Sequence, residues 1–364
     1  MLIIDGHLDL AWNAVQWGRD LTRSVYTLRA QEGGTAGKGR GLGTVALPEL
    51  RRGRVALCFA TLLARSTGRP VPHLDYTSPT QAYAAAMSHL AYYKALEQEG
   101  HVALIGDRSA LDAHIARWQM WEQSGAGEAP TLGLVISMEG ADPILAPDRL
   151  DEWYAAGLRL LGLAHYGPCR YAGGTSDEGG LTDLGHALLP ELRRLGIGLD
   201  LTHCSDAAFW EALEQYDGPV LCSHHNCRAI VPNQRQLADE QIRAVAERGG
   251  VIGAALDTWM LKPGWLIGER PDARNPPATL RDVADQIDHV CQVTGSSRHA
   301  ALGSDLDGGF GREQSPDDLD TIADLQRIGG LLAARGYADD DVAAIMHGNW
   351  LRLLRELWSA YPAL

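Results

Sequence analysis

Short runs of apolar residues recur along the chain at the length of a β-strand, and segments rich in Ala, Leu, Glu and Arg separate them. Eight such runs are present, at Leu2–Asp5, Arg54–Ala64, Thr131–Met138, Leu158–Ala164, Gly196–Thr202, Pro219–Ser223, Gly249–Leu256 and His299–Gly303. The pattern therefore predicts eight short strands distributed over most of the chain.

Between these runs lie periodic stretches that begin at or near Ser, Thr or Asp, residues that cap helix N-termini. The clearest predicted helices are Ser78–Glu99, Asp183–Leu195, Ala207–Gln215, Asp239–Glu247 and Thr279–Thr294. The acidic run Asp339–Asp341 also predicts a helix N-terminus, where carboxylates complement the helix dipole. Strand and helix thus alternate along the chain.

This alternation favours a parallel sheet with crossover helices, and a count of eight strands favours a (β/α)8 TIM barrel. An open, doubly wound sheet is the alternative. No linker divides the chain, so residues 1–364 are expected to form one barrel domain, with Gly33–Gly43 and Ser124–Pro130 as loops. The first loop superficially resembles a phosphate-binding loop. However, no strand directly precedes it, no Ser or Thr follows Lys38, and no helix opens there.

Charge and composition narrow the class of protein further. The 364 residues include 32 Lys and Arg against 46 Asp and Glu, a formal net charge of -14 with a pI near 5.3. This charge opposes binding to nucleic acid or to an anionic membrane. No run approaches the roughly 18 apolar residues of a membrane span, and Met1 begins no recognisable signal peptide, so we expect a cytoplasmic protein without a membrane partner. Six cysteines without C-x-x-C argue against a disulfide framework.

Ionisable side chains follow most of the predicted strands, at the end where barrel enzymes carry their active sites. These residues are His7 and Asp9 after the first strand, Glu139 after the third, His165 after the fourth, His203 after the fifth, His224 after the sixth and Asp305 after the eighth. Because residues i and i+2 of a strand point to the same face, His7 and Asp9 are expected to enter the barrel mouth together as two metal ligands. A buried hydrogen-bonded pair is the alternative.

The carboxylate of Glu139 follows an apolar run, so its burial as an anion costs several kcal/mol unless a cation or donors compensate. A metal pair supplies that compensation, and a salt bridge to an arginine is the alternative. His203 and His224 are one strand-helix unit apart, which places them on neighbouring strands at the same depth, where neutral imidazoles suit zinc. His225 is expected to face the other side of its strand. Packing or surface positions are predicted for other histidines, such as His89, His101, His114 and His289.

In these segments the chain resembles the membrane (renal) dipeptidase family of zinc peptidases, the M19 type of the amidohydrolase superfamily. The matching segments follow the family's order over nearly the whole chain: Asp5–Trp12, Met138–Gly140, Leu161–His165, Asp200–His203, Ser223–Asn226 with Arg228 and Arg235, Gly303–Gly308 and Gly348–Arg352. The resemblance implies a hydrolase for dipeptides of an L residue followed by an L or D residue.

The resemblance also implies a role for each candidate residue, with two zinc ions per chain. The ligands would be His7 and Asp9 on one ion, His203 and His224 on the other, and Glu139 as the bridge between them. His165 would contact the substrate near its scissile carbonyl, Arg235 would hold the C-terminal carboxylate, and Asp305 would transfer the proton. Two positions depart from the family's pattern, because Leu8 and Gln236 stand where asparagine is usual. Neither departure removes a ligand, and both would bear on substrate preference.

Physical chemistry supports these roles independently. Two zinc ions can ionise a shared water to a bridging hydroxide and polarise a peptide carbonyl. Asp305 would act as general base and then general acid, and His165 would stabilise the oxyanion. A carboxylate clamp at Arg235 would restrict the enzyme to dipeptides, although Arg235 could instead brace its loop by pairing with Asp239.

Two other functions stay open at this stage. One is a different amidohydrolase reaction, such as hydrolysis of N-acyl amino acids, lactones or phosphoesters, and the other is a barrel that binds a ligand without catalysis. The oligomeric state is also open, a homodimer included.

Overall fold

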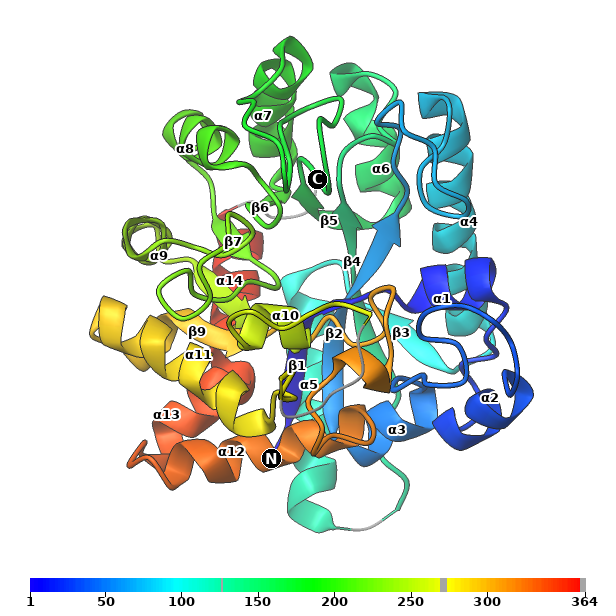
Figure 1. The fold of residues 1–364 in the computed structure, drawn as a ribbon, viewed down its shortest axis with the longest axis vertical. Helices are drawn as coiled ribbons and strands as arrows, with labels where there is room; N and C mark the ends of the chain where they lie inside the picture. Colours follow the sequence, from blue (N-terminus) through cyan, green and yellow to red (C-terminus); the bar gives the residue numbers. More distant parts are fainter. Residues whose placement is uncertain (126, 269–273, 361–364) are drawn as a thin grey trace.

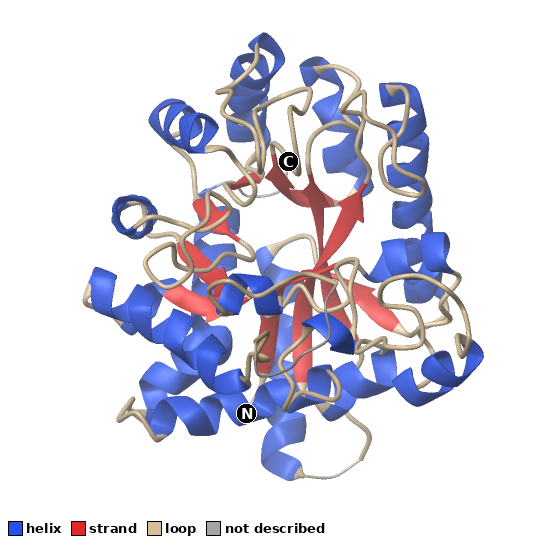
Figure 2. Ribbon diagram, viewed as in Figure 1, coloured by secondary structure: helices blue, strands red, loops and turns tan. Residues whose placement is uncertain are grey.

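Eight parallel strands close into a ring in the computed structural model, which describes residues 1–125, 127–268 and 274–360. Figures 1 and 2 show the strands at the centre with helices around them. The ring consists of β1 (Ile3–Leu8), β2 (Val55–Leu63), β4 (Leu132–Glu139), β5 (Leu158–Gly162), β6 (Gly198–Asp200), β7 (Val220–Cys222), β8 (Val251–Ala254) and β9 (Ala300–Leu302). Pairing of β9 with β1 and of β2 with β4 leaves the ring without an open edge. The fold is therefore the predicted (β/α)8 barrel, and the open-sheet alternative is wrong.

One further strand, β3 (Val102–Leu104), was not predicted. It pairs with the first residues of β4, and β5 pairs with β4 further along, so the two share one edge of β4. A strand of three residues gives no distinct apolar run in the sequence. Several predicted strands are correspondingly too long, since the run over Gly196–Thr202 is extended only at Gly198–Asp200.

The predicted helices are present with the same bounds or bounds that differ by one residue. The α-helices are α1 (Leu10–Trp17), α2 (Val25–Gln31), α3 (Leu47–Arg52), α4 (Pro79–Gln98), α5 (Arg108–Ser124), α6 (Leu150–Ala156), α7 (Asp183–Leu195), α8 (Asp206–Gln215), α9 (Asp239–Glu247), α10 (Thr258–Leu261), α11 (Leu280–Thr294), α12 (Gln326–Ala333), α13 (Asp339–Ala343) and α14 (Asn349–Ala360). Short 3-10 turns occur at Pro147–Arg149, Ser297–His299, Arg312–Gln314 and Ile322–Leu325, and a π turn at Ala344–Gly348. The hydroxyl of Ser78 caps α4 by accepting from the backbone N–H of Gln81. The acidic run at Asp339–Asp341 opens α13, as predicted.

The strands separate two apolar cores. The larger one lies against the surrounding helices, and a smaller one joins the other strand face to α5 and α14. Within the smaller core, the Trp350 ring packs edge-on against Phe59 and donates its indole N–H to the Leu302 carbonyl. A Cβ at Gly6 would lie 2.7 Å from that ring, so β1 needs glycine at this point. This packing fills the barrel beneath the candidate site.

Both predicted loops connect regular elements, the first between α2 and α3 and the second between α5 and β4. Residues 33–43 follow α2 without regular structure, and the Arg19 guanidinium anchors them by donating to the Gly39 carbonyl and to Glu32. In the predicted loop Ser124–Pro130, Ser124 ends α5, residues 125 and 127–130 lead to β4, and Ala126 lies outside the described residues. Among the described residues, no helix is long and apolar enough to span a membrane.

Candidate metal centre

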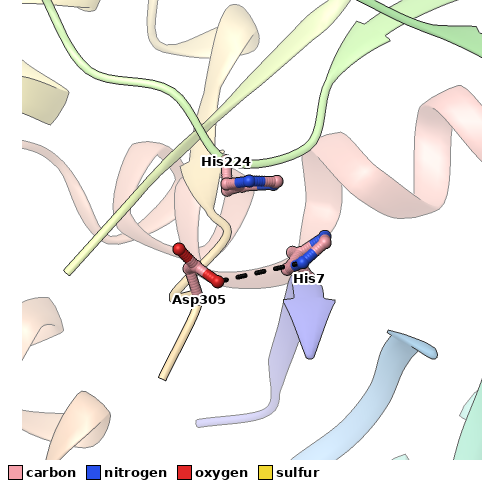
Figure 3. A group of neighbouring side chains, drawn as sticks. All are labelled: His7, His224 and Asp305. Atoms are coloured by element: carbon pink, nitrogen blue, oxygen red, sulfur yellow. Dashed lines mark ion pairs between the residues drawn. The ribbon is translucent and has the colours of Figure 1, made fainter. Parts of the chain in front are cut away.

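The residues predicted from the strand ends come together at one end of the barrel. Figure 3 shows His7, at the end of β1, with His224 and Asp305 around a common point. Three overlapping groups bring potential ligand atoms within 4.8 Å of one another: His7, His224 and Asp305; Glu139, His203 and His224; and His7, Asp9 and Glu139. His225 is also buried, but among the described residues it belongs to none of these groups.

Glu139 lies between the two sets of histidines and is buried. Its Oε1 is 3.2 Å from the Nε2 atoms of both His203 and His224, and its Oε2 is 3.6 Å from Nε2 of His7. Among the described residues, no arginine forms an ion pair with Glu139, so the salt-bridge alternative is not what the structure contains. The hydrogen-bonded pair proposed for His7 and Asp9 is also absent, since His7 Nε2 is 3.8 Å from the Asp9 carboxylate.

A hydroxyl group lies close to the Nδ1 atom of each histidine that is a candidate metal ligand. Nδ1 of His203 lies 2.9 Å from the Thr175 hydroxyl, and Nδ1 of His224 lies 2.9 Å from the Ser223 hydroxyl. The Thr61 hydroxyl is 3.4 Å from Nδ1 of His7. A hydroxyl can accept the Nδ1–H proton, which leaves the Nε2 lone pairs directed at the cluster. The sequence analysis did not identify these hydroxyls.

Irregular backbone aims several of these side chains. Between Asp5 and Leu8, β1 has one residue more than β2, and this bulge lies at the positions around His7. The Asp5 carboxylate fixes it by accepting from the backbone N–H groups of His7 and Ser304. His203 and Asp305 adopt left-handed φ angles of 66° and 57°. Such conformations are costly for residues other than glycine and are concentrated at functional sites.

The electrostatics of the cluster favour cations. Burial raises the pKa of Glu139 to about 7 despite the opposing effect of His7, and it raises the pKa of Asp305 well above its usual range. Burial and the Arg235 charge hold the pKa of His203 well below the usual range, and burial with the charges of His7 and Arg235 does the same for the pKa of His224, so both imidazoles are neutral at neutral pH. Clustered carboxylates with neutral imidazoles form a donor set for divalent metal ions.

A cavity of about 730 Å³ opens above the cluster, and the two remaining predicted residues, His165 and Arg235, line it. His165 Nε2 is 3.9 Å from Glu139 Oε1, and burial together with Arg65 and Arg235 holds its pKa well below the usual range. Arg235 is 2% exposed, and its Nη2 donates to the His224 carbonyl and lies 3.2 Å from His203 Nε2. Its Nη1 is buried without a hydrogen-bond partner among the described residues.

The sequence matches the model of the membrane dipeptidase family, Peptidase family M19, over residues 1–361. The chain belongs to this family. Membership makes it a hydrolase of the metallo-dipeptidase type, as the sequence analysis predicted.

Two curated relatives illustrate the similarity within the M19 family. A protein of Klebsiella pneumoniae named for its place in the pqqA 5′ region is 32% identical over 240 residues, which are 64% of this chain and 84% of the relative. The dipeptidase aclJ of Aspergillus oryzae is 25% identical over 362 residues, covering 98% of this chain and 78% of the relative. Among solved structures, a metallo peptidase of Rhodobacter sphaeroides, bound to a phosphinate mimic of L-Ala-D-Ala, aligns with a TM-score of 0.77. It is 23% identical and covers 98% of this chain and 99% of its own.

In this M19 chain the cavity also contains charged residues that the sequence analysis did not assign to the site, namely Lys38, Arg40, Arg65 and Asp257. Arg65 and Asp257 directly follow the apolar runs that were predicted as the second and seventh strands, and both line the cavity. The rule applied to the other strands, that ionisable residues at strand ends mark the site, would have identified both. Arg65 is 3.5 Å from the Asp75 carboxylate, whereas the donors to Asp257 among the described residues are neutral.

Proposed function

We propose that the chain hydrolyses dipeptides at a centre of two zinc ions that Glu139 bridges. The observation that carries the proposal is the position of Glu139, with one carboxylate oxygen toward His203 and His224 and the other toward His7. His7 and Asp9 would hold one ion, and His203 and His224 the second. One tetrahedral ion uses only four ligands, so five converging ligands favour two ions.

Unpaired polar atoms support a metal at this position. His7 Nε2 and Asp9 Oδ1 are buried and lack a hydrogen-bond partner among the described residues. Such atoms carry a desolvation cost that a bound cation removes. When bound, two zinc ions would supply an activated water at neutral pH and polarise the scissile carbonyl.

The protein's own side chains would perform the remaining steps. The Asp305 carboxylate lies 3.8 Å from His7, where it would accept a proton from the attacking water and return it to the leaving amine. Neutral His165 would donate an N–H to the oxygen of the scissile carbonyl as negative charge develops. Arg235 would bind the C-terminal carboxylate of the substrate with its planar guanidinium.

Arg235 also favours dipeptides over lactones and phosphotriesters, whereas N-acyl amino acids share the free carboxylate. The alternative role, a brace that pairs with Asp239, is not what the structure contains, because Asp239 accepts from His289 instead. A buried guanidinium with an unpaired Nη1 suits a free carboxylate, which a neutral phosphotriester or a simple lactone lacks. The dipeptide would carry an L residue followed by an L or D residue.

Two measurements on one preparation test this proposal. Metal analysis of the purified protein should give about two zinc ions per chain, and steady-state kinetics should show hydrolysis of L-L or L-D dipeptides but not of D-D dipeptides, N-acyl amino acids or lactones. A fully loaded protein with one ion would contradict the bridging role of Glu139. Hydrolysis of lactones or N-acyl amino acids in preference to every dipeptide would overturn the substrate assignment.

A further inference from the structure

One carboxylate in the active-site cavity has no part in the proposed metal centre. Asp257 lines the same cavity as Glu139, Asp305 and Arg235. It follows β8, is 5% exposed, and caps α10 by accepting from the backbone N–H of Trp259. Among the described residues it belongs to none of the groups of potential metal ligands.

The partners of Asp257 are neutral. The Gln314 side-chain amide lies 2.8 Å from both of its carboxylate oxygens. No Lys, Arg or His of the described residues forms an ion pair with it. A buried carboxylate held only by neutral donors keeps most of its desolvation cost, so a cation that reaches it would be stabilised. Burial accordingly raises the pKa of Asp257 to about 6, although Lys38 opposes the change.

The position of Asp257 indicates which part of a dipeptide would reach it. The α-amino nitrogen of the substrate lies two bonds, or about 2.5 Å, from the scissile carbon. It therefore stays beside the metal ligands, among Asp9, Glu139 and Asp305. Asp257 lies outside that cluster, although its charge acts on Asp305, so a longer group such as a side chain of the substrate is suited to reach it.

The surrounding walls fit a side chain with an apolar stem and a charged end. Trp259, Met260 and Phe310 line the same cavity and provide apolar surface near Asp257. The ammonium of Lys38 already lies 5.8 Å from the centre of the Phe310 ring, within the range of a cation–π contact. Lys38 is exposed and forms no ion pair among the described residues, so it is a weakly held cation that a substrate can displace.

We propose that Asp257 is a specificity residue that selects dipeptides with a basic side chain, such as that of lysine. The proposal rests on the proposed dipeptidase function and names its substrate class. Asp257 would form a charge-assisted hydrogen bond to the side-chain ammonium, while Arg235 binds the C-terminal carboxylate.

Lysine and norleucine provide a matched pair of substrates, because they share the aliphatic stem and differ in the terminal ammonium. We expect kcat/KM of wild-type protein to favour Lys-Ala over Nle-Ala, or Ala-Lys over Ala-Nle, by about tenfold or more. Asp257→Asn should bring that ratio to within about twofold of one. Asp217→Asn is the matched control, since Asp217 is on the surface with a side chain 78% exposed, and it should keep the wild-type ratio. Lys38→Met, which removes the competing cation, should keep or increase the ratio.

Phosphinate analogues of the same peptides add a readout that needs no turnover. Calorimetry should show tighter binding of the lysyl than of the norleucyl analogue to wild-type protein and loss of this difference in Asp257→Asn.

If neutral dipeptides are hydrolysed but wild type shows no lysine preference at either position, the specificity proposal is overturned and the dipeptidase proposal stands. If no dipeptide is hydrolysed, the dipeptidase proposal fails, and equal binding of the two analogues then overturns the role of Asp257 as well. Because the two analogues are compared on wild-type protein, this test of the lysine preference remains valid even if Asp257→Asn does not fold. Loss of the lysine preference in Lys38→Met would also contradict the assignment.

Discussion

Amidation of the substrate's C-terminus is the most direct perturbation of the proposed carboxylate clamp. Arg235 is buried at the cavity, and its Nη1 has no hydrogen-bond partner among the described residues. A free dipeptide carboxylate would pair with this guanidinium, whereas an amide removes the negative charge and leaves the guanidinium charge unpaired. We therefore expect the wild-type protein to discriminate against dipeptide amides.

The size of the effect follows from the burial of Arg235. Charge-assisted hydrogen bonds contribute about 1.5–3 kcal/mol, and removal of one partner of a buried charge pair costs at least about 2 kcal/mol. A loss of about 2 kcal/mol corresponds to a fall of about 30-fold in kcat/KM. Arg235→Met has no charge to leave unpaired, so it should hydrolyse acid and amide at similar, low rates.

The assay compares kcat/KM for a dipeptide and its amide in wild type, Arg235→Met and a control arginine variant. Arg228 is suited to be the control, because it is in the same loop but pairs with Asp206 at 2.7 Å and 2.9 Å. Arg228→Met should keep the wild-type ratio of acid to amide. Equal hydrolysis of acid and amide by wild type would refute the clamp, as would an equal loss of the ratio in both variants.

Three further perturbations test the metal centre, the proton transfer and a buried histidine. Glu139→Gln should retain fewer zinc ions than wild type after dialysis, because the bridging charge is lost, and full retention of two ions would contradict the bridge. Asp305→Asn should keep both ions and lower kcat by about 100-fold or more, since asparagine tolerates the left-handed φ but cannot accept the proton; near-normal turnover would exclude the role. Burial lowers the pKa of His89 to about 4, so below pH 6.5 the unfolded chain takes up a proton that the folded one does not, and stability falls as pH falls. Between pH 7 and pH 5 this costs about 2 kcal/mol, and chemical denaturation of His89→Asn should show a pH dependence smaller by that amount.

The strand pattern in the sequence was sufficient to predict the barrel, because each strand of the ring is a separate apolar run. The bounds were less predictable where a run continues past the hydrogen-bonded residues, as at Gly196–Thr202. β3 was missed because three residues beside half of β4 leave no separate signal. Helix starts were more accurate, since caps such as Ser78 act through local hydrogen bonds that the sequence itself contains.

The candidate site was predictable to the extent that it follows from the direction of parallel strands. Their carboxyl ends meet at one end of the barrel, so residues after different strands converge even when they are far apart in sequence. Arg65 and Asp257 obey the same rule, but neither is a histidine and neither lies in a segment that matches the family. The bulge around His7 and the left-handed backbone of His203 were not predictable, because both depend on contacts with other strands.

The hydroxyls on the histidines could not be found from sequence spacing, since Thr61 is 54 residues from His7 and Thr175 is 28 residues from His203. Their chemistry nevertheless affects the charge of the proposed centre. Carboxylates often hold the second nitrogen of a metal-bound histidine, and each would add a negative charge. Neutral hydroxyls leave the carboxylates of Asp9, Glu139 and Asp305 and the bridging hydroxide beside two divalent ions, which would be four negative charges against four positive. Carboxylates in place of the hydroxyls would make the centre net negative and would oppose the anion that develops on the scissile carbonyl, because electrostatic interactions are strong in a buried site. Thr175→Asp, which adds a charge behind His203, should therefore strengthen metal binding but lower kcat.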